Sequence, residues 1–230
     1  MVSHGSRAHP VIAITIDDGF SSKAVLADLA ILERERVNAT WFPIGRVVAA
    51  DPATWRAVAA AGFPIANHTY SHGFLTRYGF ARIVADIERD ESFVATIIGR
   101  PLLPFVRPLG GSWNGTVLGA AAAAGQRAVV LWDISVGDSA AMPSRANVDK
   151  LVRNASKGTN GSIILMHANG PYAQQALPRI IASYRERGFE FVTLGQMFGV
   201  DGAVPFPPAS PPTSPVAEPS PSPVPARRPT

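Results

Sequence analysis

Two adjacent carboxylates, Asp17 and Asp18, follow an apolar and largely β-branched run in the stretch VIAITIDDGF. Such a run predicts a buried strand. Repulsion between two carboxylates at the end of a buried strand is costly unless a cation or hydrogen-bond donors compensate for it. The remainder of the sequence must therefore supply such groups.

Suitable partners stand in three later stretches, with His68 and His72 in NHTYSH, Arg107 in FVRPLGGSW and His167 in IILMHANG. Each has an ordinary structural reading, such as an exposed histidine pair on a helical turn or an arginine that anchors a carboxylate. Taken together, one carboxylate and two neutral imidazoles form a three-ligand site of the kind that catalytic Zn²⁺ occupies, with positions left for water and substrate. The chemistry would be hydrolytic, with the second carboxylate as general base and an imidazole across the cleft as general acid.

Short apolar runs alternate with longer helical patterns along the chain. We expect strands at residues 11–16, 39–44, 64–66, 103–107, 127–132, 162–166 and 189–193, and helices at residues 22–35, 53–61, 80–98, 115–124, 147–156 and 174–187. This alternation predicts parallel βα units, in either an open doubly wound sheet or a closed barrel. The sequence lacks G-x-G-x-x-G after the first strand and lacks G-K-[ST], which favours the barrel. In a barrel, the loops after the strands form the active-site face, which would gather the polar residues named above.

Composition narrows the function classes. The chain has 230 residues, a net charge of +4 and no cysteine, so a metal would need nitrogen and oxygen ligands. Its arginines are scattered and not clustered into a stripe, which argues against a nucleic-acid surface. No apolar run is long enough to span a membrane, and no apolar segment resembling a signal peptide precedes the first strand.

Three segments are expected. Residues 1–9 form an N-terminal arm, residues 10–200 form the folded domain, and residues 201–230 form a tail rich in proline and serine. A tail of this composition cannot build a core, and we expect it to be extended or disordered.

Five motifs, TIDDG, HTYSH, RPLGG, WDISVGD and LMH, occur in the order typical of the polysaccharide deacetylases, carbohydrate esterase family 4. The chain resembles this family over residues 10–198. The first motif, usually T-F-D-D-G, is matched except at Ile16, and the second, H-[ST]-x-x-H, is matched fully. The resemblance implies a distorted (β/α)7 barrel and a metal-dependent hydrolase, acting on carbon–nitrogen bonds other than peptide bonds, that removes acetyl groups from a sugar polymer.

The resemblance also implies a role for each matching residue. Asp17 stands at the position of the family's general base, and Arg107 stands at the position of the residue that orients this base. The metal ligands would be Asp18, His68 and His72, holding Zn²⁺ or alternatively Co²⁺. His167 resembles the general acid, and Leu165 would line the pocket for the acetyl methyl group.

The third motif departs from the usual R-P-P-Y-G and reads RPLGG, so Gly110 stands at the tyrosine position. In the family, the backbone N–H at this position helps to hold the oxyanion. Glycine keeps that donor, so this part of the transition-state stabilisation is retained. The aromatic ring that would form part of the substrate groove is lost.

The fourth motif departs from the usual W-D-V-D-x-x-D-W. Asp138 remains and would pair with His167, raising the pKa of the imidazole, since an adjacent negative charge favours its protonated form. Ser139 replaces a tryptophan that would cover the acetyl site. Trp113 or Tyr172 would offer a replacement face for a sugar ring, although either also fits ordinary packing.

Three functions are compatible with these motifs. The favoured one is deacetylation of β-1,4-linked N-acetylglucosamine in peptidoglycan or chitin-like chains. The second is the same chemistry on acetylxylan or on a non-sugar amide, and the third is a non-catalytic carbohydrate-binding module. We expect a polysaccharide partner, a monomer, and an extracellular or cell-envelope location by resemblance.

Overall fold

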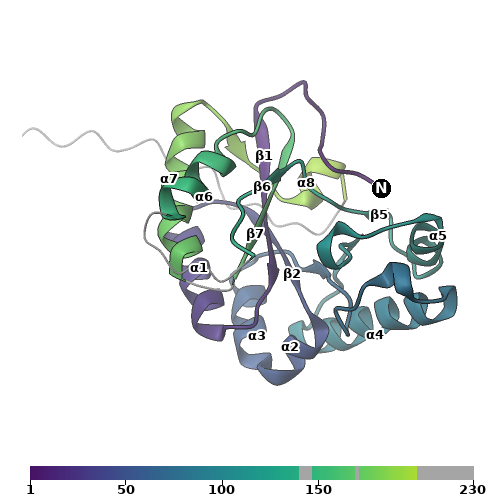
Figure 1. The fold of residues 1–230 in the computed structure, drawn as a ribbon. Helices are drawn as coiled ribbons and strands as arrows, with labels where there is room; N and C mark the ends of the chain where they lie inside the picture. Colours follow the sequence, from purple (N-terminus) through teal and green to yellow (C-terminus); the bar gives the residue numbers. More distant parts are fainter. Residues whose placement is uncertain (140–146, 169–170, 201–230) are drawn as a thin grey trace, which may run out of the picture.

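The computed structural model describes residues 1–139, 147–168 and 171–200 (Figure 1). The predicted tail, residues 201–230, lies outside these ranges. The elements are β1 (Val11–Asp18), α1 (Ser22–Glu35), β2 (Ala39–Pro43), α2 (Gly45–Ala50), α3 (Pro52–Ala60), β3 (Ala66–Asn67), η1 (Leu75–Arg77), α4 (Phe80–Ile98), β4 (Leu103–Val106), η2 (Leu109–Gly111), α5 (Gly115–Ala123), β5 (Ala128–Val129), β6 (Ile134–Ser135), α6 (Asn147–Ala155), β7 (Ser162–His167), α7 (Pro171–Glu186), β8 (Glu190–Phe191) and α8 (Leu194–Phe198).

The longer helices form where the sequence predicts them. Helices α1 and α4 have the predicted bounds, and α7 begins three residues earlier than predicted. Ser21 fixes the start of α1, because its side chain accepts a hydrogen bond from the N–H of Ala24. Sequence analysis missed α2, α8, the two 3₁₀ turns and β6, since segments this short carry too little periodicity to be recognised.

Every pairing between two of the strands named above is parallel. One sheet has the order β2-β1-β7-β6, with β8 paired to the beginning of β1, and the other has the order β3-β4-β5. A parallel bridge between Trp41 and Ile65 connects the two sheets. Helices surround them, as Figure 1 shows. The predicted parallel α/β fold is confirmed, and it is distorted in that β3, β5, β6 and β8 each contribute only two paired residues.

The N-terminal arm packs between the chain beyond β5 and strand β7. Val2 forms a parallel bridge with Val130, and His4 forms an antiparallel bridge with Ser162. The Arg7 guanidinium donates hydrogen bonds to Asp133, to the Ser162 hydroxyl and to the loop before β7. The arm thus fills a position in the barrel wall where the strands themselves are too short to meet.

The barrel interior changes from apolar to polar along β1. Ile12, Ile14 and Ile16 belong to the large cluster beneath the helices, whereas Ala13 belongs to an inner cluster with residues of the other strands. Alternate residues of a strand share a face, so Thr15 and Asp17 continue the inner face above Ala13. The core therefore ends at a buried polar layer at the C-terminal end of β1.

None of the helices in the described ranges has both the length and the apolar composition needed to cross a membrane.

The contact between the arm and the β7 loop can be tested at Gly161. This residue has φ +71, and a Cβ there would lie 2.3 Å from the backbone oxygen of Ser6. Gly188 has a similar φ of +77, but nothing lies within 4 Å of its Cβ position. Both alanine variants suffer left-handed backbone strain, whereas only Gly161→Ala displaces the arm.

We expect Gly161→Ala to lower the free energy of unfolding by roughly 1 to 3 kcal/mol more than Gly188→Ala, measured by urea denaturation. Equal losses for the two variants would show that the arm does not pack against this loop in solution.

Candidate active site and metal centre

The two carboxylates at the end of β1 face the same side chain. The Nε2 atom of His68 lies 3.7 Å from Oδ2 of Asp17 and 3.5 Å from Oδ1 of Asp18. Consecutive residues of a regular strand would point to opposite faces. Asp18 has φ +74, a left-handed backbone that ends the strand, and both carboxylates consequently reach one site.

The loop after β3 has the same unusual backbone. Thr69 has φ +63 and His72 has φ +54. The Asn67 side chain accepts a hydrogen bond from the N–H of Thr69, and the Thr69 hydroxyl accepts one from the N–H of His72. The histidines therefore lie on a strained turn and not on a helix. Left-handed residues other than glycine typically cost about 1–3 kcal/mol each and concentrate at functional sites.

The orientation of His68 is set by a backbone carbonyl. Its Nδ1 donates a 2.6 Å hydrogen bond to the carbonyl oxygen of Arg107, so the proton of a neutral ring lies on Nδ1. The Nε2 lone pair is then available on the side of Asp18. Such a hydrogen bond from the distal nitrogen is the usual support of a metal-ligating histidine.

The ligand atoms of Asp18, His68 and His72 lie within 4.8 Å of one another. Nε2 of His72 is 3.4 Å from Oδ1 of Asp18 and is buried, with no hydrogen-bond partner among the described residues. Tetrahedral ligands at Zn²⁺ distances would be about 3.3 Å apart, which matches the two separations to Asp18. Burial, followed by the neighbouring His68, lowers the pKa of His72 to about 4, so the ring is neutral as a metal ligand must be. The three residues thus fit a divalent cation.

Arg107 links the candidate metal ligand His68 to Asp17. It is fully buried, and its Nη1 donates 2.7 Å and 2.8 Å hydrogen bonds to Asp17 Oδ1 and to the Thr15 hydroxyl. Its remaining nitrogens donate to the carbonyls of Val130 and Leu131. Burial lowers the pKa of Arg107, but the Asp17 charge opposes this effect. With Oδ1 held by the guanidinium, Oδ2 of Asp17 is left facing His68.

His167 and Asp138 form the side of the site that adjoins Asp17. His167 is the last residue of β7 and is in register with Asp17 on β1. Asp138 accepts 2.9 Å hydrogen bonds from both Nδ1 and the backbone N–H of His167. Burial alone would lower the pKa of His167, but the hydrogen bond to Asp138 and the charges of Asp17, Asp138 and Asp18 outweigh it and raise the pKa. Protonation at Nε2 is therefore favoured.

The predicted substrate-binding residues differ in their burial and backbone conformation. Leu165 is buried on β7, and it shares the inward face with His167 two residues later. Gly110 has φ +61, a conformation that tyrosine would adopt only with strain. Trp113 is 41% exposed, whereas Tyr172 is partly buried against the main core.

Two supporting residues escaped sequence analysis. Thr15 donates to the carbonyl of Ile164 and accepts from Arg107, and the alternation of β1 could have placed it inward beside Asp17. Asp133, in the WDISVGD motif, pairs with Arg7 and accepts hydrogen bonds from Ser162 and from the N–H of Ile163. No motif indicates its partnership with Arg7.

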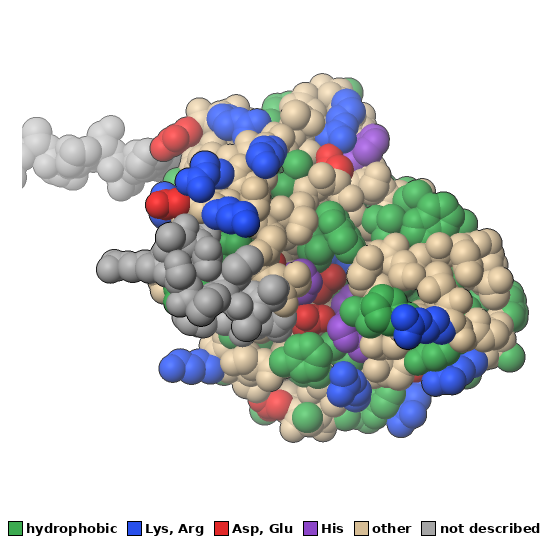
Figure 2. Space-filling view, viewed as in Figure 1, with side chains coloured by type: hydrophobic (Ala, Val, Ile, Leu, Met, Phe, Trp, Pro, Cys, Tyr) green, Lys and Arg blue, Asp and Glu red, His purple; other side chains and the backbone are tan. Residues whose placement is uncertain are grey.

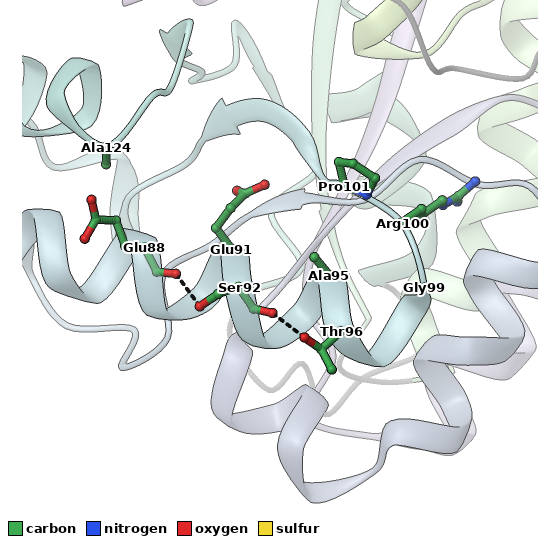
Figure 3. A pocket seen from close by; sticks show the side chains of 9 residues that line it. All are labelled: Glu88, Glu91, Ser92, Ala95, Thr96, Gly99, Arg100, Pro101 and Ala124. Carbon is green, nitrogen blue, oxygen red and sulfur yellow. Dashed lines mark hydrogen bonds between the residues drawn. The ribbon is translucent and has the colours of Figure 1, made fainter.

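Figure 2 shows acidic and histidine side chains together in the middle of one face, with hydrophobic and basic side chains around them. A separate surface pocket of about 510 Å³ lies along α4 and the segment before β4 (Figure 3). Its lining residues, which include Glu88, Glu91 and Arg100, contain none of the predicted site residues.

Comparison with known proteins places these features in a family. The profile described as polysaccharide deacetylase matches residues 4–129. A peptidoglycan-N-acetylglucosamine deacetylase of Bacillus cereus is 31% identical over 191 residues, covering 81% of this chain and 87% of that protein. A chitooligosaccharide deacetylase of Bradyrhizobium is 29% identical over 201 residues, covering 81% of this chain and 90% of that protein.

Among solved structures, a family 4 carbohydrate esterase from Streptomyces lividans, in complex with acetate, has a TM-score of 0.71 and 30% identity. The match covers 80% of this chain and 92% of that one. A profile match over more than half of the chain, together with relatives of this identity and coverage, shows that the chain belongs to the polysaccharide deacetylases, carbohydrate esterase family 4, a family of hydrolases.

Proposed function

We propose that this protein is a metal-dependent hydrolase that removes acetyl groups from N-acetylated polysaccharides and releases acetate. The observation that carries the proposal is the convergence of Asp18, His68 and His72, with Asp17 and His167 on adjoining sides of the same site. The names of the relatives support N-acetylglucosamine units of peptidoglycan or chitin-like chains as the substrate. Peptidoglycan, which the name of the Bacillus cereus relative gives as its substrate, also supports a location at the cell envelope.

The proposed metal is Zn²⁺, with Co²⁺ as the alternative, held by Asp18, His68 and His72. Two imidazole nitrogens and one carboxylate oxygen are a donor set that suits both ions. When bound, such an ion supplies Lewis acidity toward the acetyl carbonyl and toward water.

The two protonatable groups have opposite tasks in the proposed reaction. Asp17 accepts a proton from the attacking water through Oδ2, while Arg107 holds Oδ1 in place. As the water oxygen bonds to the acetyl carbon and the carbon–nitrogen bond breaks, His167 donates its Nε2 proton to the departing sugar nitrogen. The products are acetate and a free amine. The backbone N–H of Gly110 is the proposed donor to the oxyanion.

Variants at Asp17 and Asp18 are predicted to have different effects on catalysis and on metal binding. In Asp17→Asn, we expect acetate release from N-acetylglucosamine oligomers to fall by roughly 10²-fold to 10⁴-fold while bound metal is retained, because only the base is lost. In Asp18→Asn, both metal content and activity should be lost. Metal analysis and acetate assays check this, and acetate release that persists in a chelated Asp17→Asn sample would rule out the mechanism.

His167 is predicted to act without holding the metal. We expect His167→Ala to slow acetate release by roughly 10²-fold or more with an unchanged metal content. Loss of the metal in this variant would make His167 a ligand and would contradict its assignment as the acid.

Asp138→Asn tests the pairing that raises the pKa of His167. An acid is active only while protonated, so activity falls as the pH rises through its pKa. Removing the Asp138 charge lowers that pKa, and we therefore expect the basic limb of the pH profile of kcat/KM to move to lower pH. If the basic limb of the pH profile did not move in an Asp138→Asn protein with normal metal content, Asp138 would not set the pKa of the acid.

A further inference from the structure

Two exposed phenylalanines lie beside the candidate metal centre. Phe20 follows Asp18 by two residues, is 55% exposed, and its ring centroid lies 6.2 Å from that of His72, edge to face. Phe74 follows His72 by two residues and is 42% exposed. Large apolar side chains that remain exposed next to a catalytic site are candidates for ligand contact.

Phe74 lies near the space left by the missing aromatic ring at Gly110. A Cβ atom at position 110 would lie 3.6 Å from Cε1 of Phe74. The segment after Phe74 is also tied to the segment after Gly110, since the hydroxyls of Thr76 and Ser112 are 2.8 Å apart. An aromatic face is therefore present at this edge of the site, although it comes from another part of the chain.

Each phenylalanine is accompanied by an arginine. The guanidinium carbon of Arg46 lies 5.7 Å from the centroid of the Phe20 ring, and that of Arg77 lies 4.9 Å from the centroid of the Phe74 ring. Both arginines are exposed. Among the residues that the structure describes, neither guanidinium forms an ion pair with a carboxylate.

The backbone holds both arginines close to the metal-ligand loop. The N–H of Arg46 donates to the carbonyl of Tyr70, which lies between the two histidine ligands. The N–H of Arg77 donates to the carbonyl of Phe74. The backbones of Arg46 and Arg77 thus lie beside the loop that carries His72. Each arginine accompanies one phenylalanine in a Phe–Arg pair, Phe20 with Arg46 and Phe74 with Arg77.

We propose that the two Phe–Arg pairs select a glycan strand that carries carboxylates over a neutral strand of the same backbone. This inference rests on the proposed function and names the chemical class of its substrate. The apolar face of a sugar ring packs on each phenylalanine, and the adjacent guanidinium pairs with a carboxylate on the strand. The net charge of +4 adds a weak long-range attraction for the same polymer.

The test compares one polymer in two charge states. Glycan strands of peptidoglycan freed of their peptides keep the lactyl carboxylates, and carbodiimide coupling to ammonia converts these to neutral amides. For the metal-loaded wild-type protein, we expect kcat/KM to be about fivefold to tenfold higher on the acidic strands than on the amidated strands. This ratio should decline as salt rises from about 0.05 M to about 0.5 M, because exposed charges are screened.

The variants assign the preference to residues. Arg46→Gln combined with Arg77→Gln should bring the acidic-to-amidated ratio close to one through KM, while Phe74→Ala should weaken both substrates about fivefold and leave the ratio unchanged. Arg34→Gln is the matched control, because Arg34 is an exposed arginine near the C-terminal end of α1, at the opposite end of β1 from the site. A wild-type ratio of one, or the same fall in the Arg34→Gln variant, would overturn the inference.

Equilibrium binding of the same strands to Asp17→Asn protein separates this inference from the proposed function, because binding does not require turnover. Preferential binding of acidic strands by a protein that releases no acetate from any glycan would overturn only the proposed hydrolysis. Acetate release with equal binding of both strands would overturn only the selection of carboxylates.

Discussion

The buried guanidinium of Arg107 organises the candidate active site. It holds Asp17 and Thr15 through one nitrogen, and the carbonyl of the same residue fixes the tautomer of His68. The proposed general base and one proposed metal ligand are therefore positioned by a single residue directly after β4. Removing one partner of such a buried ion pair leaves an uncompensated charge, which typically costs about 3–5 kcal/mol. This constraint explains how Asp17 is buried at the end of β1, while Asp18 faces His68 and His72.

Local backbone strain complements that ion pair. Among the described residues, the non-glycine residues with left-handed φ are Asp18, Arg36, Thr69 and His72, and all but Arg36 lie in the segments that carry the proposed metal ligands. Regular strand geometry would separate the Asp17 and Asp18 side chains, and a regular helix would place the two histidines on its surface. The strained turns instead direct these groups to a common point. Packing and hydrogen bonds through Asn67 and Thr69 hold the turns in place.

The candidate site has an interior, formed by the carboxylates, the imidazoles and Arg107, and a rim, formed by the two Phe–Arg pairs. Asp17, Asp18, His68 and Arg107 are buried in its interior, and charge-assisted hydrogen bonds join Asp17 to Arg107 and Asp138 to His167. The rim carries the Phe20 and Phe74 rings together with Arg46 of α2 and Arg77, and neither arginine forms an ion pair with a carboxylate among the described residues. In a polysaccharide deacetylase, the interior would determine the reaction and the rim would determine which polymer is held. Substrate preference can therefore vary through Phe74 or Arg46 while the reacting groups stay unchanged.

The sequence by itself determined the longer helices, the parallel α/β class and the grouping of Asp17, Asp18, His68, His72, Arg107 and His167, because periodicity and ordered motifs are local properties of a chain. It did not determine the short elements, the insertion of the N-terminal arm beside β7, or the partnership of Asp133 with Arg7. It also left the edge near Gly110 without an aromatic residue, whereas Phe74 lies there in the structure. Only the tertiary structure decided these features, since each depends on residues far apart along the chain that meet through packing and carry no shared sequence signal.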